Sequence, residues 1–172
     1  MKKLNNKVAA LTGAASGIGR ALAINLAQQG CHLALSDIDE TGLNQTKKQL
    51  LKHTSGKNIN ITTHIVDVAN RANVYQYAEE VIKEHGHVDI VINNAGVAAN
   101  KTIDEIDYDD FEWVININMW GVIYGTKAFL PHLKQRPDAH IVNIASVNSM
   151  LGFPSNAPYN DAKYSCLLYP SP

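Results

Sequence analysis

Short apolar runs alternate along the chain with longer segments in which apolar residues recur every three or four positions. The first run, residues 8–11, has the length of a buried strand, and a glycine-rich turn follows it. Apolar residues then recur at Ile18, Leu22 and Leu26, and Gly30 ends the periodic segment. The pattern predicts a strand, a turn and a helix with one apolar stripe.

The same alternation continues through the rest of the chain and predicts one α/β domain. Asn70 has the side chain of a helix N-cap, and Gly86 lies where a helix C-cap is expected. Strands that alternate with helices imply right-handed crossovers, and so a doubly wound parallel sheet (a Rossmann fold) in three layers. The further strands are predicted over residues 32–36, 59–66, 88–92 and 140–144, and the further helices over residues 41–51, 70–86, 108–134 and from Pro158 onward.

Polar side chains come at the ends of these strands. Asp37, Asp67, Asn94 and Ser146 each lie at or just past the carboxyl end of a predicted strand. In a sheet of strand order 3-2-1-4-5-6, ligands bind outside the carboxyl ends of the strands. We therefore expect these side chains to share one edge of the sheet with a bound ligand.

The turn after the first strand reads Thr12-Gly-Ala-Ala-Ser-Gly-Ile-Gly19. A strand, a glycine turn and a helix present unpaired backbone N–H groups and the positive end of a helix to a phosphate. Gly13 permits a tight turn, and Gly17 and Gly19 let the backbone approach a pyrophosphate. A turn that merely reverses the chain is the alternative, but the flanking strand and helix favour dinucleotide binding.

Asp37 bears on the choice between NAD and NADP. A carboxylate at the end of the second strand accepts hydrogen bonds from the adenosine ribose hydroxyls and repels a 2′-phosphate. Neither Ser16, before the second glycine of the turn, nor Ile38 offers a positive charge to such a phosphate. The sequence therefore favours NAD, although an aspartate that only opens a loop would fit the same position.

Tyr159 and Lys163 lie four residues apart in the last predicted helix, so their side chains project from one face. A phenol, with a pKa of about 10 in water, carries protons poorly at neutral pH, and a nearby ammonium group stabilises the phenolate form. Ser146, 13 residues before Tyr159, could donate to a substrate oxygen that the tyrosine also contacts. The same serine could instead serve only a turn.

Asn118 lies inside the long predicted helix, where asparagine is mildly unfavourable. It either faces solvent or marks a kink that holds a water molecule near Lys163.

A serine hydrolase is a poor alternative, because Ser146 lacks the Gly-x-Ser-x-Gly elbow and no histidine follows His140.

Composition narrows the function classes further. The 172-residue chain is 45% hydrophobic with a formal net charge of −1 and mixed charges, which does not indicate a nucleic acid or an anionic membrane as partner. Cys31 and Cys166 are not spaced as a metal site or a disulfide framework. No apolar run reaches the length of a signal-peptide core or a membrane span. We expect a cytoplasmic protein without a metal.

Together these residues resemble the short-chain dehydrogenase/reductase family, from about Lys7 to Tyr164. Residues 12–19 are similar to the family's cofactor loop, and residues 93–96, Asn-Asn-Ala-Gly, to its fourth-strand motif. Asp67 and Val68 resemble the pair that contacts adenine. The resemblance implies cofactor contacts from thirteen residues: Gly13, Ser16, Gly17, Ile18, Gly19, Asp37, Asp67, Val68, Asn94, Ala95, Gly96, Tyr159 and Lys163.

The resemblance also implies a reaction, the reversible transfer of a hydride between NAD(P) and a secondary alcohol or carbonyl compound. Asn118, Ser146, Tyr159 and Lys163 match the family's catalytic tetrad in order and spacing. Tyr159 would then be the general acid/base, and Ser146 would orient the substrate oxygen. Lys163 would hold the nicotinamide ribose and favour the phenolate, and Asn118 would hold a water of the proton relay. Asp161 departs from the small residues common there in the family.

Members of the family continue beyond the last predicted helix through further strands and a substrate lid. We therefore expect residues 1–165 to form a domain that lacks its last strands. Two prolines and no helical stripe follow Tyr164, so residues 166–172 are expected to be a non-native tail. A fifth strand without a neighbour predicts poor solubility and little turnover. By the resemblance, the full-length parent is a homodimer or a homotetramer.

Substrate and function class are less constrained. A dinucleotide sensor or scaffold without chemistry is one alternative, but the intact tetrad argues against it. A methyltransferase on a related sheet is another, and it would leave the Asn-Asn-Ala-Gly segment and the Tyr/Lys pair unexplained. A neutral, apolar alcohol or ketone is favoured by the apolar residues that follow strands four and five, namely Val97, Ala98, Met150, Leu151 and Phe153.

Overall fold

The computed structural model, which describes residues 4–54 and 58–167, has a five-stranded sheet at its centre. All four strand pairs are parallel, and the strand order is β3-β2-β1-β4-β5. This order confirms the doubly wound sheet that the alternating pattern predicts. The strands are β1 (Val8–Thr12), β2 (His32–Asp37), β3 (Ile61–Ile65), β4 (Ile90–Asn93) and β5 (His140–Asn143).

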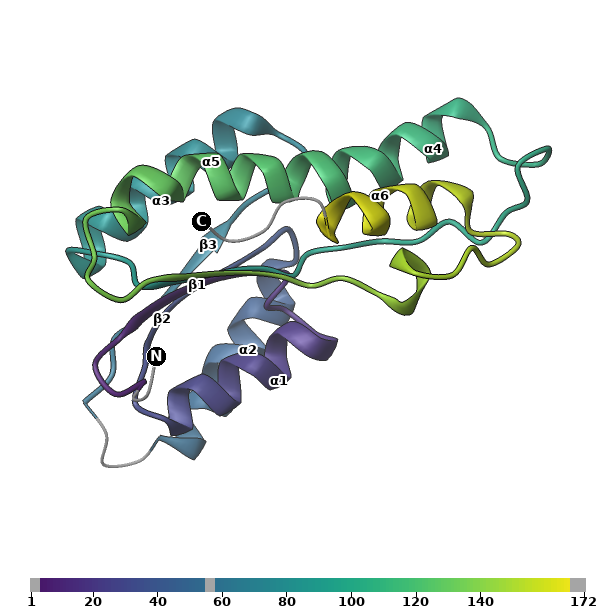
Figure 1. Ribbon diagram of the computed structural model, residues 1–172. Coiled ribbons are helices and arrows are strands. Elements are labelled where there is room, and N and C mark those ends of the chain that lie inside the picture. Colours follow the sequence, from purple (N-terminus) through teal and green to yellow (C-terminus); the bar gives the residue numbers. More distant parts are fainter. Residues whose placement is uncertain (1–3, 55–57, 168–172) are drawn as a thin grey trace.

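Helices cover both faces of the sheet. In Figure 1, α1 and α2 lie below the sheet, and α3 to α6 lie above it. None of the helices among the described residues is long and apolar enough to cross a bilayer. The helices are α1 (Gly17–Gln28), α2 (Glu40–His53), α3 (Arg71–His85), α4 (Tyr108–Ile115), α5 (Gly121–Leu133) and α6 (Ala157–Leu167), with a π-helical turn η1 (Asn116–Trp120) and a short 3₁₀ turn η2 (Val147–Ser149).

β1 is buried along its whole length because both faces of the central strand are covered. Ala9 and Leu11 pack towards α1 and α2, whereas Val8 and Ala10 pack in the cluster on the other face. In that second cluster, the hydroxyl of Tyr77 donates to the carbonyl of Ala34 at 2.7 Å, so this buried phenol is satisfied. The sheet is therefore the shared wall of two apolar cores.

Two details differ from the sequence expectations. Ile18 is 63% exposed in the first turn of α1, so the expectation that it joins the buried stripe is wrong, and Ala23, Leu26 and Ala27 form that stripe instead. The helix expected to break down after Tyr164 continues to Leu167. Cys166 is buried there, with its Sγ 3.6 Å from the carbonyl oxygen of Asn118. The rest of the expected tail, residues 168–172, lies outside the described residues.

The long helix expected over residues 108–134 is observed as α4, η1 and α5, which follow one another directly. The asparagines at 116 and 118 fall in the π-helical turn η1, which joins α4 to α5. The glycines at 121 and 125 lie inside α5, where each has close neighbours that a side chain would meet. A Cβ on Gly121 would lie 3.1 Å from the side chain of Val68, and one on Gly125 would lie 2.2 Å from Oδ1 of Asn93. The missing side chains let α5 lie close to β4 and to the loop that follows β3.

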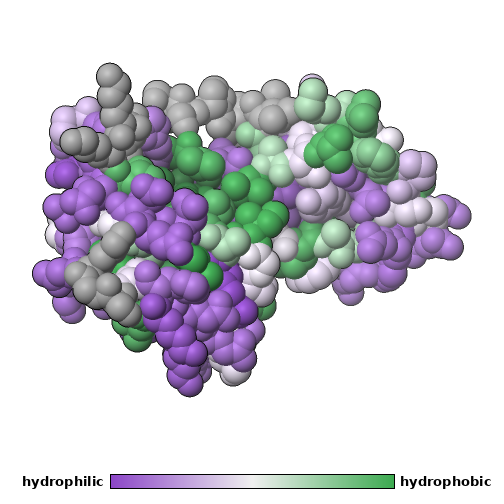
Figure 2. All heavy atoms as spheres, turned by 90° about the horizontal axis from the view of Figure 1, so that it is seen from below, coloured by the Kyte–Doolittle hydropathy of each residue, from purple (hydrophilic) through white to green (hydrophobic). Residues whose placement is uncertain are grey.

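β5 forms the outer edge of the sheet in the described part of the chain. It pairs with β4 on one side, and no other described strand pairs with it. Val142 in this strand is 40% exposed. Seen from below, a hydrophobic area lies open beside the polar surface of α1 and α2 (Figure 2). The open edge expected from the sequence is present in the structure.

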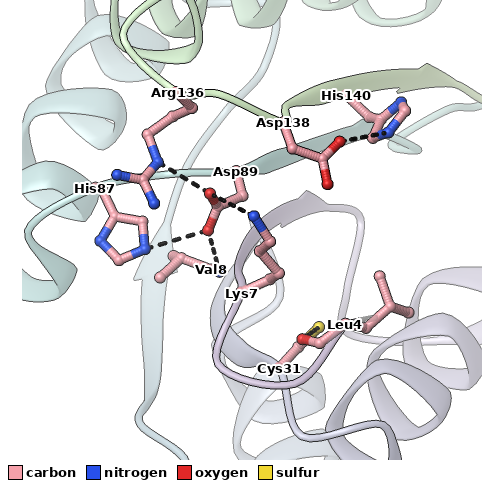
Figure 3. Close-up of polar contacts among 9 residues, drawn as sticks. All are labelled: Leu4, Lys7, Val8, Cys31, His87, Asp89, Arg136, Asp138 and His140. Carbon is pink, nitrogen blue, oxygen red and sulfur yellow. Dashed lines mark hydrogen bonds and ion pairs between the residues drawn. The ribbon is translucent and has the colours of Figure 1, made fainter. Parts of the chain in front are cut away.

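Asp89 joins three strands at the end of the sheet opposite to the glycine turn (Figure 3). Its fully buried carboxylate accepts from the backbone N–H of Val8 at 3.0 Å and from Nε of Arg136 at 2.9 Å. Lys7 and His87 add contacts at 3.4 and 3.2 Å. Burial raises the pKa of Asp89, but these hydrogen bonds and charges lower it by more, so the net shift is downward.

Replacing Asp89 with Asn should therefore destabilise the fold. The substitution keeps the shape of the side chain but leaves the partners of a buried charge unpaired, which costs about 3 kcal/mol. Urea unfolding at pH 7 measures this loss. The control is Glu79→Gln, at a surface carboxylate 3.8 Å from His132, which should change stability by less than about 0.5 kcal/mol.

The sign of the pH dependence follows from the lowered pKa of Asp89. A carboxylate whose pKa is lower in the folded state stabilises the fold above its unfolded pKa of about 4, and this contribution is lost as the pH falls through the folded pKa. The stability gap between the parent chain and Asp89→Asn should therefore narrow in acid. A gap that stays constant from pH 7 to pH 3 would contradict this account.

Candidate functional site

A cavity of about 480 Å³ lies at the carboxyl ends of β1, β2 and β4. The glycine turn, the end of β2 and the segments after β3 and β4 form its walls. Eleven of the thirteen residues expected to contact a cofactor line it, namely Gly13, Ser16, Gly17, Ile18, Gly19, Asp37, Asp67, Val68, Asn94, Ala95 and Gly96. The structure thus gathers on one edge residues that are spread over more than eighty positions of sequence.

Each of the three glycines in the turn is required for a different physical reason. Gly13 adopts φ +67°, and a Cβ there would lie 2.8 Å from Cα of Ala95. A Cβ on Gly19 would lie 2.0 Å from the carbonyl oxygen of Gly13. Gly17 also has positive φ, +50°, but its missing Cβ would meet nothing within 4 Å. Gly13 and Gly19 therefore close the turn, and Gly17 leaves its backbone open to the cavity.

The first turn of α1 has N–H groups to offer an anion. Its N-cap residue Ser16 makes no side-chain cap, and the turn contains no acidic residue. By contrast, α2, α3 and α4 begin with side-chain caps from Asp39, Asn70 and Asp107. Uncapped N–H groups at the positive end of a helix favour a negatively charged ligand such as a phosphate.

Thr12 and Asn94 fasten the end of β1 to the end of β4. The hydroxyl of Thr12 accepts from the backbone N–H groups of Asn94 and Ala95, at 3.0 and 3.1 Å. In return, Nδ2 of Asn94 donates to the carbonyls of Thr12 and Gly13, at 2.9 and 3.1 Å. Asn94 therefore lines the cavity, but its side-chain donors are used to hold the glycine turn in place.

Asp37 is held against the glycine turn. Its Oδ2 accepts from the backbone N–H of Ala15 at 2.9 Å, and its Oδ1 accepts from the N–H of Asp39 at 3.1 Å. The carboxylate thus both shapes the loop, as the simpler alternative required, and lines the cavity. Each oxygen keeps lone-pair capacity for a further donor.

Asn118 is fully buried, so the expectation that it might face solvent is wrong. Its Nδ2 donates to the carbonyls of Val97 and Val114, and its Oδ1 accepts from the N–H of Val97 at 3.1 Å. A Cβ on Gly96 would lie 2.6 Å from that Oδ1 and 3.4 Å from Nζ of Lys163. The segment after β4 therefore meets both Asn118 and Lys163.

Lys163 is 4% exposed and reaches inward from α6. Its Nζ donates to the carbonyl of Ile144 at 2.8 Å and lies 5.7 Å from the ring centroid of Tyr159. Burial lowers the pKa of Lys163, and the nearby Cys166 thiol acts in the opposite direction. Asp161 is exposed and is not among the groups that shift this pKa. The helical spacing thus brings the lysine and the tyrosine together.

Ser146 is the N-cap of η2. Its Oγ accepts from the N–H of Asn148 at 3.3 Å, and Ser149 completes a reciprocal capping box with its backbone. The turn role left open by the sequence is therefore real. It does not exclude a contact with a substrate, because the side chain is only partly buried.

The cavity also has walls that the sequence did not indicate. They are apolar, and the only signal for Ile38 and Val66 is that each adjoins an aspartate at a strand end. Ser146, Tyr159 and Lys163 are absent from the described residues that line this cavity, although Lys163 approaches its rim at Gly96. The additional lining residues are Ile38, Val66 and Ile117, and Val97, which the sequence singled out only as an apolar residue after strand four, lines the cavity as well.

Metal-binding chemistry has no candidate within the part of the chain that the structure describes. No cluster of three or more His, Cys, Asp or Glu side chains there is arranged to hold a metal ion. The chemistry available at this edge is that of backbone N–H groups, two carboxylates, a phenol, a hydroxyl and a buried amine.

Comparison with known proteins agrees with this geometry. A Mycobacterium tuberculosis protein named as an oxidoreductase, SadH, is 42% identical over 165 residues, which are 96% of this chain and 58% of that protein. A short-chain dehydrogenase/reductase from Burkholderia phymatum in complex with NAD superposes with a TM-score of 0.91 at 38% identity, over 98% of this chain and 59% of the other.

A third relative carries the other cofactor type. The alcohol dehydrogenase of Thermococcus sibiricus complexed with 5-hydroxy-NADP gives a TM-score of 0.86 at 31% identity, over 94% of this chain and 67% of the other. The chain thus spans roughly 60% of the length of its first relatives. Since the family model for short-chain dehydrogenases matches residues 7–167, the chain belongs to the short-chain dehydrogenase family of oxidoreductases.

Proposed function

We propose that the complete protein containing this chain is an NAD-dependent oxidoreductase that interconverts a neutral secondary alcohol and its carbonyl compound. The observation that carries the proposal is the pairing of the open glycine turn with a buried lysine beside a tyrosine. A dinucleotide-binding edge alone would serve a sensor equally well, whereas a phenol beside an amine that approaches the cavity at Gly96 provides an acid/base pair.

The cavity has the features that a dinucleotide needs. Gly17 leaves open space where a Cβ would obstruct a phosphate, and the uncapped turn of α1 faces the same loop. Asp37 would accept from ribose hydroxyls, and Asp67 with Val68 would form the adenine side. When bound, the nicotinamide supplies or accepts the hydride. We propose NAD rather than NADP because the carboxylate of Asp37 would repel a 2′-phosphate.

Side chains of this protein would transfer the proton to or from the substrate oxygen. Tyr159 would donate it to, or accept it from, the substrate oxygen, and Ser146 would donate a hydrogen bond to that oxygen. Lys163, held by the carbonyl of Ile144, would stabilise the phenolate and bind ribose hydroxyls. The side chain of Asn118 is bonded to Val97 and Val114, so its main-chain carbonyl, which also lies 3.6 Å from Sγ of Cys166, would hold the water of a proton relay.

The segment between η2 and α6 favours an apolar substrate. Met150, Leu151 and Phe153 are 80%, 59% and 42% exposed in the loop between η2 and α6. This segment hangs below the sheet in Figure 1, and hydrophobic side chains gather there in Figure 2. Apolar surface of this kind binds uncharged ligands by the hydrophobic effect. We also propose that the complete protein assembles as a homodimer or a homotetramer.

Tyr159→Phe should abolish turnover and leave cofactor binding intact. Removing the hydroxyl takes away the general acid/base, so kcat with NAD⁺ and 1-phenylethanol, cyclohexanol or 2-octanol should fall by about 100- to 10,000-fold. NADH fluorescence should report an unchanged Kd. Tyr164→Phe, at an exposed tyrosine of the same helix, is the matched control and should behave like the parent. Undiminished turnover in Tyr159→Phe would refute the acid/base role of Tyr159.

Asp37→Ala should shift the preference towards NADP. The variant loses ribose acceptors and the repulsion of a 2′-phosphate, so the ratio of Kd for NADPH to Kd for NADH should fall at least tenfold, about 1.4 kcal/mol. Fluorescence titration with both cofactors measures the ratio. Glu40→Gln, which removes an exposed charge nearby, should not alter it. Tighter binding of NADPH than NADH by the parent protein would refute the proposed preference.

Gly17→Ala should weaken cofactor binding without unfolding the protein. The added methyl group enters open space but obstructs a phosphate, and the positive φ costs about 1 kcal/mol. We expect Kd for NADH to rise at least tenfold and Tm to fall by only a few degrees. Gly86→Ala is the matched control, because it has φ +78° and open space but ends α3 far from the cavity. It should lose similar stability and bind NADH normally.

A further inference from the structure

Two asparagines connect η2 to α6. Nδ2 of Asn148 donates to Oδ1 of Asn160 at 2.8 Å, and Nδ2 of Asn160 donates to the carbonyl of Phe153 at 3.0 Å. Asn160 is fixed in turn by the helix, since its N–H donates to the carbonyl of Asn156 at 2.8 Å. The two side chains therefore form a hydrogen-bonded chain from the loop to the helix.

This chain has a defined direction. The carbonyl of Phe153 can only accept, so Asn160 must present its amide nitrogen there and its oxygen to Asn148. Asn148 must then present its own nitrogen to Asn160, which directs its Oδ1 towards Ser146. Oγ of Ser146 lies 3.3 Å from that oxygen and donates its proton to it. The orientation of one serine hydroxyl is thus set by a carbonyl seven residues further along the chain.

The place of Asn160 in the sequence makes this orientation relevant to the chemistry. It directly follows Tyr159 on α6, whereas Ser146 comes from the end of β5 and caps η2. The Asn148–Asn160 bond spans twelve residues and ties these two elements together. The backbone N–H of Asn148 also donates to Oγ of Ser146, so the oxygen stays held when its proton turns away.

We propose that Asn148 and Asn160 are positioning residues that hold the Ser146 hydroxyl in register with the Tyr159 hydroxyl. This inference rests on the proposed function. When a carbonyl substrate binds, the Ser146 proton turns from Oδ1 of Asn148 to the substrate oxygen. The N–H of Asn148 still holds the serine oxygen, and no covalent bond changes. The two asparagines would thus hold the Ser146 hydroxyl in position without forming a hydrogen bond to the hydroxyl of Tyr159.

Substitutions in two backgrounds test the pair in the complete protein. Asn148→Ala and Asn160→Ala should each lower kcat for the reduction of acetophenone, cyclohexanone or 2-octanone by NADH about tenfold, with KM for NADH unchanged. In a Ser146→Ala background they should cause no further loss, because both act through that hydroxyl. Asn156→Ala is the control, since it removes only a side chain that lies outside the chain of hydrogen bonds and keeps the backbone carbonyl that accepts from Asn160.

The outcomes separate this proposal from the proposed function. If Ser146→Ala leaves kcat unchanged, the assigned role of the serine fails. If Ser146→Ala lowers kcat but the asparagine variants do not, or if their losses persist in the Ser146→Ala background, only the positioning role fails. A loss in Asn156→Ala equal to that in Asn160→Ala would indicate a general effect on the loop and would also overturn it.

A readout without turnover tests the hydrogen bonds themselves. In ¹⁵N–¹H spectra, the side-chain amide protons of Asn148 should exchange slowly with solvent in the parent protein and faster in Asn160→Ala. Asn156→Ala should leave that exchange rate as it is in the parent. An Asn148 signal that is the same in Asn160→Ala and the parent would overturn the proposal even if no tested ketone is reduced.

Discussion

The central position of β1 is the constraint on which the rest of this structure depends. β1 pairs with β2 on one side and with β4 on the other, and it is buried on both faces. Its carboxyl end therefore lies between the ends of two neighbours, which supply Asp37 and the segment 94–96. Parallel pairing alone places these groups at one edge, and the bonds between Thr12 and Asn94 then fix the glycine turn between them.

The sequence predicted the parts of the fold that follow from local periodicity. Val74, Tyr77, Ala78 and Val81 form a buried stripe on α3, as their spacing indicates, and Gly86 ends that helix in a left-handed conformation. The expected cofactor residues could be found because each adjoins a strand end or a glycine turn. Their position on the cavity wall agrees with that expectation, although their contacts with a cofactor remain a proposal.

The details that the sequence could not provide depend on tertiary contacts. Ile18 has the spacing of a core residue, but the first turn of α1 faces the cavity, so the side chain is exposed. Asn118 has the residue type of a solvent-facing position in a helix, but a π-helical turn directs it inward to the backbone of Val97. Periodicity reports the face of a helix and not its local winding. Likewise, no spacing rule indicates that Asn148 meets Asn160.

The grip of Asn118 on Val97 has a mechanical consequence. The side chain of Asn118 bonds both the N–H and the carbonyl of Val97. A displacement of Val97 would therefore break these bonds or move the helical segment formed by α4, η1 and α5 with it. The segment that follows β4 is also restrained at Lys101, which forms a β-bridge with Asn156 and an ion pair with Asp110. Residues 98–100 lie between these two attachments, so they form a short span that is fastened to the helices at both ends.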